Sequence, residues 1–310
     1  MPVTVTVRQR SGMATGYHEG EQKENLKLLQ VFGDESHDPK CERVFAAAAL
    51  FGTEEQWAAF RPLWTERLGG RVFHASDCET DHGEFADTPH SENLQLYADL
   101  TKLLAKSTLL GFGSAMDLAG YYEFFGDAPA DIPYYRCFRD VVWQCGKWAK
   151  WAIPADTAEF HFDQRVESDY NAGVLYGHIA ILPDWDCAKF LRTPLKISSR
   201  TEVGIQAADL YAREVMKHLD NTVGPVKRPM RRSMAALRAT NRFGCDLHLR
   251  EFFEDFKRKF DGLAVKTGMN VDHYRQWLGK HGQADSISSR HRYLIDLDGT
   301  EAAAQSGTRQ

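Results

Sequence analysis

The order of the apolar segments along the chain constrains its fold more than any other feature. Two short apolar runs come first, at 26–32 and 43–52, as in a β-hairpin. After them, helical spacing alternates with further short apolar runs, for example the helical 91–107 before the strand-like 108–118. This order predicts an α/β protein with a mixed sheet. We expect the strand over 26–34 to be central, with helices on both faces.

The chain has 310 residues, a length compatible with one large domain or two ordinary ones. Residues 1–25 are polar and show no clear period, which predicts an N-terminal arm. We expect one domain over 26–280, with helical structure in its C-terminal extension from 249 to 278. The mostly polar residues 281–310 predict a C-terminal tail.

Composition indicates an ordinary globular protein that works without a membrane. Hydrophobic residues make up 43% of the chain, the net charge is −5, and no apolar run approaches the length of roughly eighteen residues that a membrane helix needs. The six cysteines include no C-x-x-C pair, and the first residues lack the apolar core of a secretory signal. We therefore expect reduced thiols and a cytoplasmic location.

Two predicted strands end in aspartate. The first apolar run, LLQVFG, is followed by Asp34, and the strand EFHFD ends in Asp163. Alternation places Phe160 and Phe162 on one face of the later strand, and His161 and Asp163 on the other. Each aspartate alone is also typical of an ordinary turn.

A third aspartate lies on the apolar face of a predicted helix. Ser199 and Glu202 fit a capping box, which predicts that the helix begins near residue 200. Asp209 falls four residues after Ile205, inside the apolar stripe. A buried carboxylate costs several kcal/mol, on the order given for unpaired charges, unless it is paired or bound to a metal. An ion pair with Arg213, one turn further on, is the structural alternative.

These three segments resemble the family named domain of unknown function 3800. The resemblance rests on FGDESHD, FHFDQR and SSRTEVGIQAADLYA and covers about residues 26 to 220. Members of that family typically show a strand ending in D-E-S, a later strand ending in Asp, and a helix with Q-x-A-D-L. The resemblance implies a ribonuclease H-like fold, which supports metal-dependent nucleases, and a catalytic trio of Asp34, Asp163 and Asp209. His37 stands where the family usually has Gly.

The chemistry of the residues supports the same trio. Hard divalent cations such as Mg²⁺ or Mn²⁺ prefer oxygen ligands. Three or four converging carboxylates can hold two such ions roughly 3.5 to 4 Å apart and promote cleavage of a phosphodiester. Asp77 is our first choice for a fourth catalytic carboxylate, although a solvated acidic loop is the alternative. Further acidic residues near these sites are Glu79, Asp81, Glu84 and Glu35, of which the last points away from Asp34 by alternation.

Histidines accompany the acidic loop. His74, His82 and His90 lie within or beside it, but their spacing fits no tight zinc motif. A histidine there could instead act as a general base or contact a phosphate.

A basic stretch follows the helix that contains Asp209. We expect it to form a phosphate-binding edge beside the metal site, giving local positive charge that the net charge hides. An ordinary solvated loop is the alternative. The predicted nucleic-acid-binding residues are Arg200, Lys227, Arg228, Arg231 and Arg232, and Lys196 could extend the set.

Two classes of function remain open from the sequence. One is a Mg²⁺- or Mn²⁺-dependent nuclease or related phosphodiesterase that acts on DNA or RNA. The other is a non-catalytic ribonuclease H-like module that binds nucleic acid or a protein partner. Convergence of the three aspartates favours the first, whereas an ion pair between Asp209 and Arg213 favours the second.

Overall fold

The fold is known from a computed structural model. It describes residues 28–126, 132–151, 156–163, 169–181, 187–191 and 193–267. The predicted N-terminal arm (1–25), the C-terminal tail (281–310) and the last part of the helical extension lie outside the described residues.

The described strands form one mixed six-stranded sheet in the order β5-β4-β1-β2-β3-β6. β1 pairs antiparallel with β2, and β2 with β3, whereas β4 runs parallel to β1, β5 to β4, and β6 to β3. The prediction of a mixed α/β sheet with a central first strand is confirmed. The strands are β1 (Leu28–His37), β2 (Val44–Thr53), β3 (Leu110–Asp117), β4 (Thr157–Asp163), β5 (Lys196–Ser198) and β6 (Phe243–His248).

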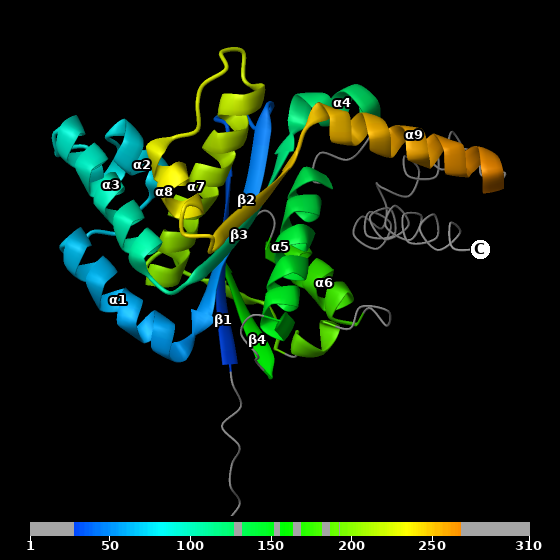
Figure 1. The fold of residues 1–310 in the computed structure, drawn as a ribbon. Helices are drawn as coiled ribbons and strands as arrows, with labels where there is room; N and C mark the ends of the chain where they lie inside the picture. The colour runs from blue at the N-terminus through cyan, green and yellow to red at the C-terminus, as the bar shows by residue number, and fades with distance from the viewer. Residues whose placement is uncertain are drawn as a thin grey trace, which may run out of the picture.

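Helices cover both faces of the sheet, as predicted (Figure 1). One face, on the left of Figure 1, packs against α1 (Glu54–Leu68), α2 (Ala75–Thr80), η1 (Gly83–Phe85), α3 (His90–Lys106), α7 (Val203–Val223) and α8 (Arg232–Arg238). The other packs against α4 (Leu118–Phe125), α5 (Ile132–Trp151), α6 (Asp169–Ala180), η2 (Ala188–Phe190) and α9 (Arg250–Thr267). Within these ranges, no helix is both long and apolar enough to cross a membrane.

Alternation along β1 and β4 decides which side chains face α7. Val31 packs in the core on the α5 side, and Phe32 in the core on the α7 side. Asp34 therefore faces α7, because residues two apart in a strand share a face. On β4, Phe162 packs on the α5 side, so Asp163 also faces α7. The parallel pairing runs up to Gly33 opposite Phe162, which brings the two aspartates to neighbouring positions on adjacent strands.

Two local predictions are wrong. β1 does not end at Asp34 but runs on to His37, because its polar residues pair with the small side chains of Ala46 to Ala48 on β2. α7 begins at Val203, and no side chain caps its N-terminus, so the predicted capping box is absent. Residues 71–74 are irregular and lead into α2.

A glycine lets α7 pack closely on β1. A Cβ atom added to Gly204 would lie 2.3 Å from Cγ of Phe32, whose ring is buried. This close approach brings Asp209, further along the same helix, down towards the two strands.

We predict that Gly204→Ala destabilises the protein by about 1 to 3 kcal/mol, because the added methyl group overpacks a buried ring. Gly173→Ala in α6 is the matched control, since an added Cβ there meets nothing within 4 Å. The control should gain up to about 1 kcal/mol from helix propensity. Urea midpoints measure both changes, and equal effects of the two substitutions would contradict the packing argument.

Candidate functional site

The structure brings the three predicted aspartates to one buried site. Asp34 lies within β1, Asp163 ends β4, and Asp209 lies on α7, which packs across β1 and β2. Their exposed fractions are 7%, 5% and 7%. The site therefore joins two neighbouring strands to the helix that covers them.

The carboxylates of this site repel one another. Burial raises the pKa of Asp34 well above its ordinary value, and the negative charges of Asp209, Glu35 and Asp163 raise it further. Burial also raises the pKa of Asp209, while His74, the Ala75 N–H, Arg200 and Arg213 act in the opposite direction. Asp209 and Asp163 therefore lie close enough to Asp34 for their charges to act on it, and ionisation of Asp34 in this site is costly.

Arg200 supplies the positive charge that offsets part of this repulsion. Its Nε donates to Oδ2 of Asp163 at 3.1 Å. Burial lowers the pKa of Arg200, but Asp163, Asp34 and Asp209 together raise it above the ordinary value. The arginine side chain is 56% exposed, whereas that of Asp163 is 2% exposed. A predicted nucleic-acid-binding residue thus lies directly at the carboxylates, with a side chain that can leave towards solvent.

One oxygen of the site has no partner in the described structure. Oδ1 of Asp163 is buried and accepts no hydrogen bond. A buried carboxylate oxygen of this kind is costly unless a cation or a donor reaches it. Its environment matches the oxygen-rich surroundings that Mg²⁺ and Mn²⁺ prefer.

Asp209 does not form the ion pair with Arg213 that a purely structural role predicts. Its Oδ2 accepts the backbone N–H of Ala75 at 2.7 Å. Arg213 instead donates from Nε to Oε2 of Glu79 at 2.8 Å. Because a carboxylate has about four acceptor sites, the bond to Ala75 leaves Asp209 able to bind a further group.

Gln206 is a contributor that sequence reasoning missed. Its Oε1 accepts the backbone N–H of Phe73 and the indole N–H of Trp64, both at 3.2 Å. Gln206 and Asp209 are three residues apart and so lie on one face of α7. Together they bind the chain at Phe73 and Ala75. The Gln and Asp of the Q-x-A-D-L pattern thus hold the segment that leads into α2, and their helical spacing was the available signal.

The acidic side chains near α2 have different partners. Oδ2 of Asp77 lies 3.0 Å from Nδ1 of His74. Glu84 accepts the backbone N–H of Val72 at 2.7 Å, and Asp81 accepts from Asn93 at 2.8 Å. Of these acidic residues, Asp77 contacts His74, which precedes α2. Its role as a fourth catalytic carboxylate stays a prediction. Of the other predicted histidines, His90 contacts Asp81 and His82 contacts Thr80.

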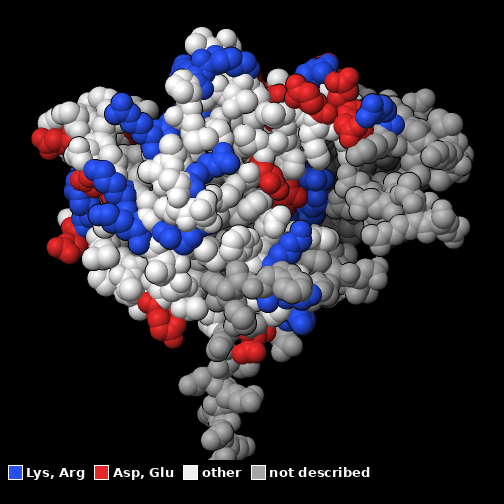
Figure 2. All heavy atoms as spheres, viewed as in Figure 1, with Lys and Arg blue, Asp and Glu red and all other residues white. Residues whose placement is uncertain are grey.

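The basic stretch separates into two parts. Lys227, Arg228 and Arg232 are exposed, and basic side chains are visible at the tip of the connection between α7 and α8, at the top of Figure 2. The backbone N–H of Arg228 donates to the carbonyl of Asn221, near the end of α7. Asn221 lies twelve residues beyond Asp209, which is roughly 18 Å along the helix axis. The tip is thus displaced from the carboxylates rather than adjacent to them.

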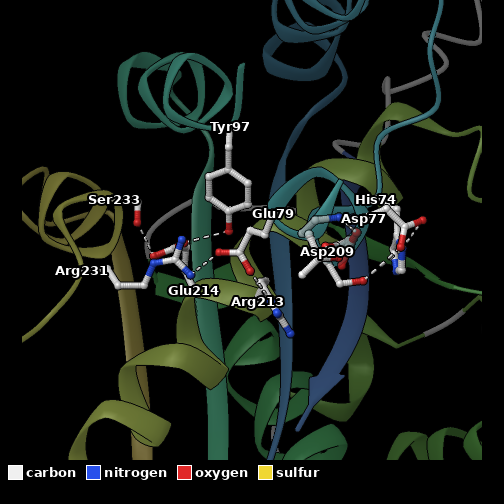
Figure 3. A network of polar contacts seen from close by, with 12 residues as sticks. His74, Asp77, Glu79, Tyr97, Asp209, Arg213, Glu214, Arg231 and Ser233 are labelled. Carbon is white, nitrogen blue, oxygen red and sulfur yellow. Dashed lines mark hydrogen bonds and ion pairs between the residues drawn. The ribbon is translucent and has the colours of Figure 1, made fainter. Parts of the chain in front are cut away.

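Arg231 belongs to a buried ion-pair network instead (Figure 3). It pairs with Glu79, and its guanidinium lies 3.4 Å from Oε1 of Glu214, whose side chain is fully buried. Tyr97 also donates to Glu214, at 2.8 Å. Burial lowers the pKa of Arg231, but Tyr97, Glu214 and Glu79 raise it above the ordinary value. These contacts tie α8 and the preceding loop to α2, α3 and α7.

Fit to a divalent cation can be judged from these observations. Across the described ranges, no three or more His, Cys, Asp or Glu side chains are already arranged as a group that could hold a metal ion. The trio nevertheless has the right chemistry, since its carboxylates repel and one buried oxygen lacks a partner. Arg200 holds Asp163, so a cation would have to replace its charge. The aspartates therefore offer the oxygen atoms that Mg²⁺ or Mn²⁺ prefers, but in the described structure they are not arranged to hold such an ion.

The substitution Asp34→Asn tests whether the negative charge of Asp34 destabilises the fold. Because the pKa of Asp34 is raised in the folded state, the folded protein loses stability as pH rises from the ordinary aspartate value through the raised value. In chelator at neutral pH, the variant should be more stable than the wild type by on the order of 1 kcal/mol. Urea midpoints between about pH 4 and pH 8 measure this. Asp87→Asn, at an exposed position, should show no such gain.

Arg231→Met tests whether this arginine has a structural role. Removing it leaves Glu79 and the buried Glu214 with less compensation, which should cost on the order of 2 kcal/mol after allowance for its partial exposure. Arg228→Met, at the exposed tip, should stay within about 0.5 kcal/mol of the wild type. Thermal and urea unfolding of both variants decide the question. Equal stabilities would mean that Arg231 acts only at the surface.

Comparisons with known proteins give no further identification. No protein-family model matches the chain, and neither a curated protein nor a solved structure was found to be similar to it. The function therefore has to be argued from the carboxylates, their counter-charge and the basic surface.

Proposed function

We propose that this chain is a metal-dependent nuclease or related phosphodiesterase. The observation that carries the proposal is the convergence of Asp34, Asp163 and Asp209 from β1, β4 and α7 on one buried site. Three charged groups that destabilise one another are retained where a structural role would be served better by neutral side chains. A site that binds a cation explains why the charges are there.

The three aspartates would hold Mg²⁺ or Mn²⁺. When bound, such an ion polarises a phosphate oxygen and lowers the pKa of an attacking water. Arg200 neutralises the carboxylates in the absence of the ion, and its half-exposed side chain can turn to the substrate phosphate once that charge is supplied otherwise. Its ion pair with Asp163 places it beside the reacting phosphodiester in this proposal.

The exposed basic residues in and after the connection between α7 and α8 favour a polymeric substrate over a small phosphodiester. Lys227, Arg228 and Arg232 are exposed, and none of them forms a salt bridge with an acidic side chain that the structure describes. The separation of roughly 18 Å between Asp209 and Asn221, near the end of α7, corresponds to about five steps of a duplex strand at 3.4 Å each. The tip can therefore contact the phosphate backbone beyond the cleavage point. In this proposal Arg231 holds α8 and the loop before it in position through Glu79 and Glu214.

The fold belongs to the same proposal. We propose that the chain has a ribonuclease H-like fold and belongs to the family named domain of unknown function 3800. The three segments that resemble this family support the proposal, because they form a central strand, its parallel neighbour and the helix that packs across them. We also place the protein in the cytoplasm. This rests on the six cysteines of the sequence, which include no C-x-x-C pair.

A non-catalytic module is the second candidate. The ion pair between Arg200 and Asp163 favours it, because the arginine occupies a carboxylate that catalysis requires for the cation. In such a module the three aspartates and Arg200 would form a permanent charge network, and the exposed basic residues would bind nucleic acid or an acidic protein partner.

Incubation of the purified full-length protein with labelled single- and double-stranded DNA and RNA distinguishes the candidates. We expect cleavage of at least one substrate with Mn²⁺ or Mg²⁺ and none with chelator. Asp163→Asn should reduce cleavage by at least roughly 100-fold, since a lost ligand removes several kcal/mol of transition-state stabilisation. It should also abolish the rise in melting temperature that a cation bound to the native state produces.

Asp87→Asn is the control for this experiment and should behave as the wild type, because its side chain is exposed. Binding of nucleic acid without cleavage, unchanged by cation and by Asp163→Asn, would support the non-catalytic module. An equal thermal shift in the wild type and in Asp163→Asn would show that the ions bind elsewhere.

A further inference from the structure

Charged side chains along one face of α7 lead from the carboxylate site towards the exposed basic tip. Arg213 lies one turn beyond Asp209, Lys217 one turn beyond Arg213, and Asp220 three residues further on. Residues three or four apart share a face of a helix, so these side chains form one row. Lys217 lies roughly 12 Å along the helix axis from Asp209, between the carboxylates and the tip.

The neighbours of Lys217 in this row are paired within the protein. Nε of Arg213 donates to Oε2 of Glu79 at 2.8 Å (Figure 3). Oδ1 of Asp220 lies 3.2 Å from Nη2 of Arg43, which precedes β2. Each of these two charges thus has a partner of opposite sign inside the structure.

Lys217 has no such partner in the part of the chain that the structure describes. It forms no hydrogen bond or ion pair there, although it is only partly exposed. Burial lowers the pKa of Lys217, and the positive charge of Arg213 lowers it further. Glu79 and Asp220 act in the opposite direction, but each already binds an arginine. An ammonium group in this position is incompletely compensated and gains from an anion supplied from outside.

The basic tip is attached to the same end of α7. The carbonyl of Asn221 accepts the backbone N–H of Arg228 at 3.0 Å, and its Nδ2 donates to the carbonyl of Pro229 at 3.1 Å. Asn221 is itself buried, so the backbone that carries Lys227 and Arg228 is held against the helix. Unpaired positive charge therefore begins halfway along α7 and continues beyond its end.

We propose that Lys217 binds a backbone phosphate of the nucleic acid, so that the bound strand follows this face of α7 from the carboxylate site to the tip. The inference rests on the proposed function, because it concerns the same substrate, and it adds the path that the substrate takes. At 3.4 Å for each step of a duplex strand, roughly 12 Å places this contact three or four phosphates from the carboxylates. The phosphate supplies the anion that the protein does not offer to Lys217.

Binding of labelled oligonucleotides to the full-length protein tests this path. Fluorescence anisotropy in chelator, with single- and double-stranded DNA and RNA over a range of salt concentrations, measures affinity without cleavage. Lys217→Met keeps a long side chain but removes its charge. It should weaken binding by roughly 3- to 10-fold near 0.1 M salt and reduce the salt slope of log affinity by about 1. Lys217→Arg should keep both values.

Two further variants show whether the contact lies on the path to the tip. Arg228→Met should reduce the salt slope by about 1, and its combination with Lys217→Met by about 2, because two phosphate contacts are lost. A double variant that binds as Arg228→Met alone does would overturn the path. Lys102→Met on α3 is the matched control, since Lys102 pairs with Asp99 at 3.1 Å, and it should bind as the wild type does.

Urea unfolding separates this role from a structural one. Because Lys217 has no ion-pair partner among the described residues, Lys217→Met should be at least as stable as the wild type. Weaker binding that comes with a loss of stability would assign Lys217 to the fold and overturn the inference.

The outcomes also distinguish the inference from the proposed function. Binding that Lys217→Met leaves unchanged and Arg228→Met weakens overturns the path alone. A lower salt slope for Lys217→Met, in a protein that cleaves no substrate with Mn²⁺ or Mg²⁺, supports the path and overturns the nuclease. Failure of the wild type to bind any of the four nucleic acids overturns the partner that both proposals require.

Discussion

The mutual repulsion of Asp34, Asp163 and Asp209 is the constraint on which the rest of the structure depends. Each carboxylate is buried, and burial together with neighbouring negative charges raises the pKa of Asp34. A fold that keeps three such groups together must hold them rigidly, because each would otherwise move towards water. The parallel pairing of β1 with β4 fixes two of them, and the close packing of α7 on β1 fixes the third.

α7 combines the structural and the chemical parts of the site. Asp209 belongs to the carboxylate cluster and also accepts the N–H of Ala75, while Gln206 accepts the N–H of Phe73. The helix therefore positions the segment at the start of α2 with the same face that it presents to the strands. A change at Asp209 affects the charge of the site and the attachment of α2 together. Its effect on stability has to be separated from its effect on cation binding.

Sequence reasoning predicted the mixed sheet and its central strand, because alternation and helical spacing are local patterns that long-range pairing respects. The trio of aspartates was named from the resemblance and from carboxylate chemistry, and its convergence was left open. It did not predict that β1 continues through Asp34, since this depends on the alanines of β2 across the sheet. Nor did it predict the start of α7 at Val203. The basic stretch was treated as one surface, whereas burial divides it. Arg231 belongs to an internal network and Lys227 is exposed. Partners that are distant in sequence decided each of these points.

The charge balance of the site links its two proposed ligands. Arg200 and a divalent cation offer positive charge to the same carboxylates, so each weakens the need for the other. In the proposed function, Arg200 would leave Asp163 when a cation supplies the positive charge there, and its guanidinium would then be free to donate to a substrate phosphate. The phosphate adds negative charge and in turn favours the cation. Cation and phosphodiester should therefore bind cooperatively, with Arg200 moving between the protein carboxylate and the substrate. In this proposal a single arginine at the edge of the sheet would couple substrate binding to assembly of the site.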